Sequence, residues 1–225
     1  MRATTLLCAF AAIGCSEAQP PAPAPVPPPP NQANGHRNQE PRTREECQRY
    51  QYTTDFFGYC LYQVAQRGEG DITAERLCEG AGSWTNECRN AWATARGDKF
   101  HRWELEPLLE ACTSDDCRFE VLDFRAHPSV STQIERCRQH TGRFGGDCAA
   151  HAMDRWLKAS PTLEEVDALA ATTLYADRVG YYIALASGCL SLGECRGSEA
   201  VTQRCLQVIE DLRRPDNNLC VQLRR

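Results

Sequence analysis

The sequence predicts an all-α domain stapled by disulfide bonds, and three observations lead to this fold class. From about Thr43 onward, apolar residues recur at helical spacing, and sustained period-two alternation is absent. Two Thr-x-x-Glu sequences have the pattern of helix capping boxes. The last twelve of the 14 cysteines lie in the same region, an even set compatible with six disulfides. We therefore expect residues 43–225 to form one compact helical bundle or degenerate helical repeat.

The chain begins with a signal-like segment. Met1-Arg2 supplies a positive charge, and Ala3 to Ile13 is an uncharged, mostly apolar stretch of eleven residues. This is the length of a signal-peptide core and too short to span a bilayer. The stretch ends in Ala12-Ile13-Gly14-Cys15, which resembles the cleavage box of bacterial lipoproteins: small or aliphatic residues, then Gly or Ala, then Cys. Ala12 stands where that family usually has Leu.

The resemblance implies that residues 1–14 are removed and that Cys15 becomes a lipid-carrying N-terminus, with acyl chains such as palmitate. It further implies anchoring in a bacterial cell envelope, and Ser16 resembles the residue that directs such proteins to the outer membrane. The alternative is cleavage after Ala18, at the small-x-small sequence that ends there, which would release a soluble secreted or periplasmic protein. Both alternatives leave twelve cysteines in an oxidising compartment, where disulfides form.

Residues 15–42 then form the lipid anchor and a proline-rich linker. Nine of the 13 prolines lie between Pro20 and Pro41, four of them in the run Pro27 to Pro30. Such a segment cannot build a core and favours an extended polyproline II conformation. Its continuation from Asn31 is polar and is predicted to be disordered. A lipid anchor followed by this spacer would hold the folded domain away from the membrane. The alternative is a linker with no length requirement.

Helix signals follow one another through the domain. The capping boxes are Thr43-x-x-Glu46 and Thr162-x-x-Glu165, and the second box begins a long helix predicted from Leu163 to Ala186, loosened at Gly180. Three further helices are predicted from apolar stripes: Trp84, Cys88, Ala91, Trp92 and Ala95, ending before Gly97; Cys148, Ala152 and Trp156, after an Asp147 cap; and Val201, Cys205, Val208, Ile209 and Leu212, stopped by Pro215.

The cysteines fall into three groups of four, in a degenerate repeat. The groups are Cys47, Cys60, Cys78 and Cys88; Cys112, Cys117, Cys137 and Cys148; and Cys189, Cys195, Cys205 and Cys220. Phe56, Trp84 and Phe144 each stand four residues before a cysteine, and Gly82 and Gly142 each stand six before one. A cysteine near a helix end can staple a neighbouring helix without bending it. We predict that the disulfides stay within each group of four.

The sharpest chemical motif is a doubled Cys-x-x-His, Cys137 with His140 and Cys148 with His151. Residues at i and i+3 share a helix face, so two such pairs could hold a tetrahedral zinc ion or serve a hydrolase. His151 and Asp154 beside a cysteine also resemble the catalytic helix of secreted phospholipases A2, in which Asp directly follows the histidine. Here Ala152 occupies that position. Against this cluster, an oxidising compartment favours a disulfide at the two cysteines.

Other function classes lack their signals. The net charge of −5 gives no basic field for nucleic acid. The sequence has no Cys-x-x-Cys, Gly-x-Ser-x-Gly, phosphate-binding loop or His-Glu-x-x-His, so no cofactor is indicated. We expect a binding or structural interaction module without enzyme activity, which reaches the membrane through the lipid on Cys15. An envelope protein is its expected partner.

Overall fold

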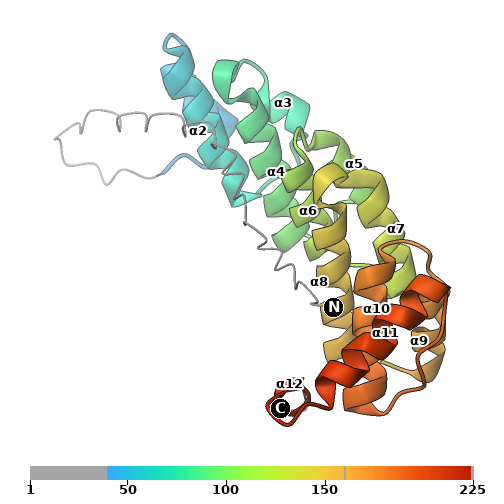
Figure 1. Cartoon of the computed structure of the whole chain (residues 1–225). Helices are drawn as coiled ribbons and strands as arrows, with labels where there is room; N and C mark the ends of the chain where they lie inside the picture. The colour runs from blue at the N-terminus through green and yellow to red at the C-terminus, as the bar shows by residue number, and fades with distance from the viewer. Residues whose placement is uncertain (1–39, 160, 224–225) are drawn as a thin grey trace, which may run out of the picture. The chain divides into compact units, whose positions relative to one another are not determined.

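The computed structural model describes residues 40–159 and 161–223 and confirms the all-α class (Figure 1). Within these residues there are twelve α-helices, three 3-10 turns and no strand. The helices are α1 Arg44–Cys47, α2 Thr54–Arg67, α3 Ala74–Cys78, α4 Thr85–Lys99, α5 Leu105–Ala111, α6 Asp115–Phe124, α7 Val130–His140, α8 Gly145–Lys158, α9 Leu163–Ala170, α10 Ala176–Leu190, α11 Glu199–Leu212 and α12 Leu219–Leu223, and the 3-10 turns are η1 Gln48–Tyr50, η2 Gly82–Trp84 and η3 Gly142–Phe144. The signal-like segment, Cys15 and the linker up to residue 39 lie outside the described residues.

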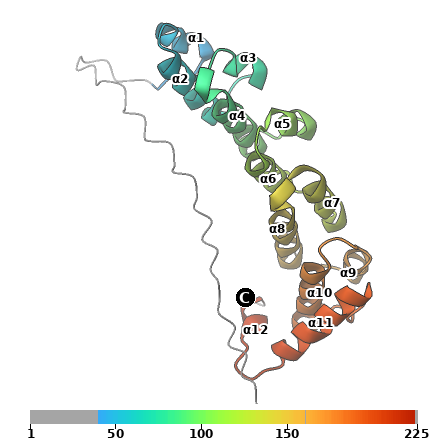
Figure 2. The same cartoon turned by 45° about the horizontal axis from the view of Figure 1, so that its top comes forward.

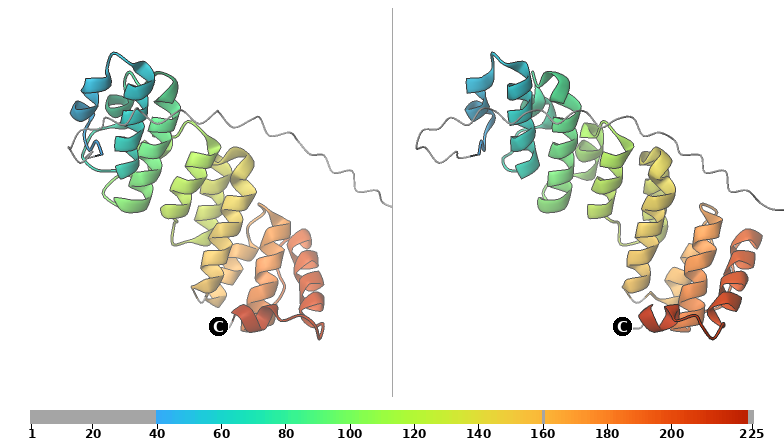
Figure 3. Two further views of the ribbon diagram at one scale, coloured as in Figure 1. Left: turned by 90° about the vertical axis from the view of Figure 1, so that its left-hand side faces the viewer. Right: turned by 60° about the vertical axis from the view of Figure 1, so that its left-hand side comes forward.

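The helices form a series of hairpins, each made of a shorter helix followed by a longer one. The pairs are α1 with α2, α3 with α4, α5 with α6, α7 with α8, and α9 with α10. Each long helix packs on the next, so that α2, α4, α6, α8, α10 and α11 lie side by side in chain order (Figure 2 and Figure 3). Packing of each unit on its sequence neighbours is the arrangement of a helical repeat. Of the two predicted architectures, the degenerate repeat describes these helices better than a bundle.

The buried apolar residues form two clusters rather than one. The first surrounds Trp92 of α4, which is 2% exposed, and the second surrounds Ile183 of α10, which is fully buried. Helix α8 contributes to both, with Cys148 in the first cluster and Met153 in the second. Helix α7 likewise contributes residues to both clusters, so the two cores are joined through the α7–α8 hairpin.

The two predicted capping boxes differ in outcome. Thr162 and Glu165 form the complete reciprocal pair at the start of α9. At α1 the Thr43 side chain accepts a hydrogen bond from the Glu46 backbone N–H at 3.3 Å. The Glu46 carboxylate, however, accepts from the backbone N–H of Arg42 at 2.7 Å. Only half of the first box is formed.

The predicted long helix from Leu163 to Ala186 is wrong. The chain leaves the helix after Ala170 and resumes it at Ala176, directly after Tyr175, whose φ of +50° no helix accommodates. Gly180 is an interior residue of α10 and does not loosen it. A Cβ at this position would lie 2.7 Å from both the Arg204 Cβ and the Val201 carbonyl oxygen of α11, so the glycine allows close helix packing.

Two predicted helix ends also move. Helix α4 continues through Gly97 to Lys99, and the Arg125 side chain hydrogen-bonds the carbonyls at that end. Helix α8 begins at Gly145, because η3 leads directly into it, so Asp147 lies in the first turn instead of at the cap. The Asp147 carboxylate instead forms an ion pair with Arg178 of α10 at 3.0 Å. None of the described helices is both long and apolar enough to cross a membrane.

Candidate functional site

All twelve cysteines of the helical domain are joined in disulfides. The six bonds are Cys47–Cys60, Cys78–Cys88, Cys112–Cys117, Cys137–Cys148, Cys189–Cys220 and Cys195–Cys205. Every bond lies within one of the three groups of four. In each of the first four bonds, the end of a short helix is tied to the longer helix of its hairpin. The staple is therefore a repeated feature of the hairpins.

The two glycines that recur six residues before a cysteine share a backbone conformation. Gly82 and Gly142 have φ of +61° and +48°, and each opens a 3-10 turn that leads straight into a long helix. Left-handed φ values favour glycine, so the same residue recurs where the same turn recurs. The third cysteine group departs from this pattern: Cys189–Cys220 ties α10 to α12, and Cys195–Cys205 ties the preceding loop to α11.

The metal or hydrolase cluster is not formed. Cys137 and Cys148 are bonded to each other, with a Cα–Cα distance of 5.6 Å. A cysteine binds a metal ion as a thiolate, and a disulfide supplies none, so Cys137 and Cys148 are not available as ligands beside His140 and His151 in this structure. Within residues 40–159 and 161–223, no group of three or more His, Cys, Asp or Glu side chains is placed to hold a metal ion.

His151 and Asp154 have separate partners. His151 Nδ1 lies 3.2 Å from an Asp123 carboxylate oxygen, and Asp123 also pairs with Arg155. The Asp154 carboxylate accepts from Lys158 one turn later. The structure therefore does not bring His151 and Asp154 together, and the resemblance to the phospholipase helix does not extend to its catalytic pair.

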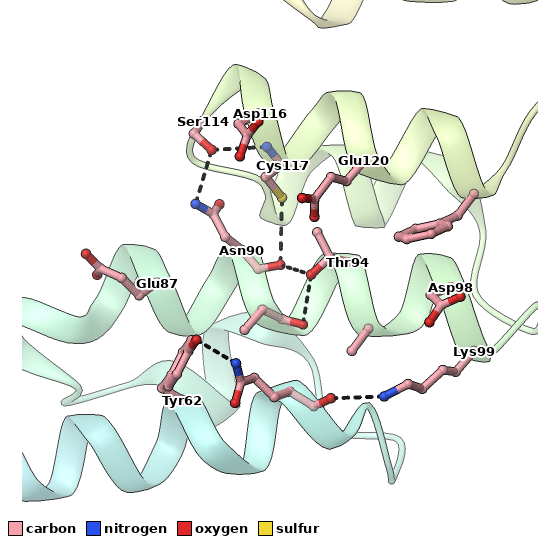
Figure 4. Close-up of a pocket in the computed structure, with 14 residues that line it drawn as sticks. Tyr62, Glu87, Asn90, Thr94, Asp98, Lys99, Ser114, Asp116, Cys117 and Glu120 are labelled. Carbon is pink, nitrogen blue, oxygen red and sulfur yellow. Dashed lines mark hydrogen bonds between the residues drawn. The ribbon is translucent and has the colours of Figure 1, made fainter. Parts of the chain in front are cut away.

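A groove of about 490 Å³ lies between α2, α4 and α6 (Figure 4). Its floor is α4, where the side chains Ala91, Thr94 and Ala95 are small. Its walls carry larger groups, with Tyr62 on α2 and Phe124 on α6. The hollow exists because small residues on the middle helix face long ones on its two neighbours. We refer to it as the α4 groove.

Hydrogen bonds fix the α6 wall of the α4 groove at one end. The Asn90 amide oxygen accepts from the Thr113 backbone N–H at 2.8 Å, and its NH₂ group donates to the Ser114 hydroxyl at 3.2 Å. Ser114 is the N-cap of α6 and accepts from the backbone N–H of Cys117. Asn90 thus ties α4 to the first turn of α6, which is stapled by the Cys112–Cys117 disulfide. This end of the groove is preorganised.

The α4 groove is acidic. Four carboxylates line it, from Glu87, Asp98, Asp116 and Glu120, against the single cation Lys99. The Lys99 ammonium lies 3.4 Å from the Gln66 carbonyl oxygen, which connects α4 with α2 at the far end (Figure 4). Burial, and then the neighbouring Asp116 carboxylate, raise the pKa of Glu120. With four carboxylates and one ammonium group, the groove carries a net negative charge.

Two further hollows carry weaker features. One of about 400 Å³ between α5, α6 and α7 mixes Arg118, Arg136 and His140 with two glutamates. The other, about 160 Å³, lies beside Trp156 and is mostly apolar. The first hollow mixes both signs of charge, and the second carries the single cation Arg155.

Sequence reasoning did not find the α4 groove, because its lining comes from three separate helices. The apolar stripe of the sequence predicts Ala91 and Ala95 on one face of a helix, and both also line the groove. Asp116 was hidden by its position in a first helical turn, where an acidic residue has an ordinary role. In the sequence, only the small residues of α4 could have indicated a groove.

The chain matches no protein-family model, and no curated protein or solved structure is significantly similar to it. The fold and its bonds define the class of protein directly: a disulfide-stapled, all-α repeat of helical hairpins with an acidic groove over α4.

Proposed function

We propose that this chain is a lipid-anchored protein of a bacterial cell envelope, whose helical domain acts as a binding or structural interaction module. The observation that carries the proposal is the complete pairing of the twelve domain cysteines. Disulfides persist in exported proteins and are rare where cytosolic reductants keep thiols reduced. The pairing supports export, which the signal-like segment independently indicates.

The same pairing supports a separate role for Cys15. Every cysteine between residues 40 and 223 has a partner in that region, so the domain offers Cys15 no thiol. Cys15 follows Gly14 at the end of an apolar run, the position that lipoprotein processing modifies. Lipidation gives this cysteine a function that pairing does not.

The interaction role is supported by the scaffold and its groove. Disulfides fix α2, α4 and α6 each within its own hairpin, and the hydrogen bonds from Asn90 tie α4 to the start of α6. A preorganised surface loses little conformational entropy when a partner binds. The α4 groove is the hollow of the described surface that best fits such a role.

The proposal is tested by the intact mass of the mature protein. The full chain is expressed in a bacterium with an outer membrane, the membranes are isolated, and the mass is measured with and without reduction. We expect a chain that begins at acylated Cys15 and that gains two hydrogens for each of the six disulfides on reduction. Cys15→Ser, which cannot be lipidated, is the control and is expected to lose the acylated form.

Two results would contradict the proposal. An unmodified chain beginning at Gln19 in the soluble fraction would show cleavage after Ala18 and overturn the anchor. A mature mass unchanged by reduction would show free thiols and overturn the export argument.

A further inference from the structure

We propose that the α4 groove binds a cationic segment of a partner protein, one that presents lysine or arginine side chains next to an apolar side chain. The inference rests on the proposed interaction role and names the chemistry of its partner. Three independent properties of the groove lead to it: its length, its aromatic walls and its net negative charge.

The length of the groove fits a peptide segment. Along α4 the lining runs from Glu87 to Lys99, which corresponds to about 18 Å of helix. Its floor of Ala91, Thr94 and Ala95 leaves space between the flanking helices that a partner's side chains can fill. A volume of about 490 Å³ lies within the range of protein ligand sites. An open trough of this length suits several consecutive residues better than a compact small molecule.

The walls offer aromatic surface on both sides. Phe124 of α6 is 45% exposed, although its side chain is large and apolar. On α2, Tyr62 belongs to an aromatic group in which its ring lies 5.5 Å from that of Trp84 and 6.2 Å from that of Tyr59. Aromatic faces attract ammonium and guanidinium groups and also bury apolar side chains. A partner that covers Phe124 would bury its exposed apolar surface.

The charge of the groove selects the sign of the partner. The twelve ion pairs of the described residues all lie outside the groove, and no side chain in that part of the chain pairs with its four carboxylates. Two arginines that adjoin lining residues in the sequence of α4 and α6 are engaged elsewhere. Arg89 of α4 donates to the Ala111 and Glu110 carbonyls, and Arg118 of α6 pairs with Asp115. A cationic partner would supply the missing countercharge.

The carboxyl group of Glu120 also favours a positively charged partner. Its pKa is raised by burial and by Asp116, so its ionised form lacks a stabilising neighbour. A bound ammonium or guanidinium would reverse that effect and add a charge-assisted hydrogen bond. Anionic partners such as nucleic acid are repelled by the same carboxylates.

The test uses the full chain with its six disulfides, purified in detergent, and two fluorescent peptides. The first is a helix-forming peptide of about 12 residues that carries lysines next to leucines on one face, and the second has every lysine replaced by glutamine. We expect the lysine peptide to bind and its affinity to fall as salt is raised, and we expect the glutamine peptide to bind at least about ten-fold more weakly.

Variants locate the binding. Asp98→Asn with Glu120→Gln removes two charges from the groove without shortening either side chain, and we expect a loss of affinity of about five- to ten-fold. Thr94→Leu fills the floor without changing charge and is expected to weaken binding to a similar extent. The matched control is Glu79→Gln with Glu210→Gln, which removes two exposed carboxylates outside the groove and should leave the affinity within two-fold of the parent value.

Each other outcome overturns the inference. No binding of the lysine peptide to a chain that keeps its six disulfides would do so, as would equal losses in the groove and control variants. Equal binding of the two peptides would show that charge does not select the partner. None of these results touches the acylated mass of Cys15, so the anchor proposal is decided separately.

Discussion

Arg125 caps the carboxyl end of α4, with its Nε donating to the backbone carbonyl of Gly97 at 3.0 Å. Its other guanidinium nitrogens donate to the carbonyls of Arg96, Phe100 and His101. The last carbonyls of a helix lack hydrogen-bond donors within it and form the negative end of its dipole. A guanidinium group supplies both donors and a positive charge. Arg89 does the same for the end of α5.

Replacing Arg125 should destabilise the domain. Arg125→Met keeps much of the apolar stem and leaves the α4 carbonyls without their donor, so we expect a loss of about 2–3 kcal/mol in the free energy of unfolding. Urea unfolding with the disulfides intact measures it. Arg76→Met is the control, because the Arg76 side chain is exposed and has no polar partner among the described residues. Equal losses in both variants would contradict the capping role.

Two glycines inside helices should respond in opposite directions to alanine. At Gly58 of α2, a Cβ would lie 2.2 Å from the Ala81 carbonyl oxygen, which is backbone and cannot move aside cheaply. At Gly97 of α4, the nearest atom would be the Val121 Cα at 3.5 Å, an ordinary contact. We expect Gly58→Ala to cost about 1–3 kcal/mol and Gly97→Ala to be neutral or stabilising by up to about 1 kcal/mol.

The measurement is the thermal midpoint of each oxidised variant by circular dichroism. A midpoint for Gly58→Ala at or above that of the parent chain would show that α2 and the loop before η2 are not in the close contact described.

The disulfides should differ in value according to the loops they close. In the chain-entropy model, the five-residue separation of Cys112–Cys117 gives about 2 kcal/mol, and the 31-residue separation of Cys189–Cys220 gives about 4 kcal/mol. Double alanine variants of each pair, compared by urea unfolding, should therefore rank in that order. The reverse ranking would mean that native packing around the sulfurs outweighs loop entropy.

Glu120 should give the domain a pH-dependent weakness. Its pKa is raised in the folded state by burial and by Asp116, so ionisation opposes folding; the cost is full above the folded pKa and absent below the unfolded one. Glu120→Gln should therefore raise the thermal midpoint at pH 7. The gain should vanish as the pH falls below the unfolded glutamate pKa of about 4.3.

The check is a pair of thermal unfolding curves for each protein, at neutral pH and at about pH 3, with the disulfides intact. A gain of the same size at both pH values would attribute the effect to helix propensity instead of charge.

The fold class and the main helices could be predicted from the sequence because their signals are local. Val201 and Cys205 share the apolar face of α11, and Thr162 and Glu165 form the complete box that opens α9. The break between α9 and α10 could not be predicted in the same way, because it depends on the left-handed φ of Tyr175. A tyrosine does not indicate a positive φ, as a glycine or an asparagine would.

Gly180 shows why a local pattern can mislead about a glycine. In a helix its absent side chain lowers intrinsic stability, which suggests a loosened turn. The reason for the glycine lies on another helix, where Val201 and Arg204 approach too closely for a Cβ. The α4 groove has the same kind of origin, since Tyr62, Thr94 and Phe124 meet only when three helices are placed together.

The order of the disulfides bears on how this chain acquires its covalent structure. Five of the bonds join cysteines that are consecutive in the sequence of the domain. The first four of these have separations of 5 to 13 residues and follow one another without overlap. A chain that enters an oxidising compartment from its N-terminus can close each of them before the next cysteine pair emerges. The Cys189–Cys220 bond encloses Cys195–Cys205. Cys189 therefore enters the compartment long before its partner Cys220 and can meanwhile pair wrongly with Cys195. The first eight cysteines therefore have little opportunity to form wrong disulfides. A disulfide isomerase would be needed mainly for the last four.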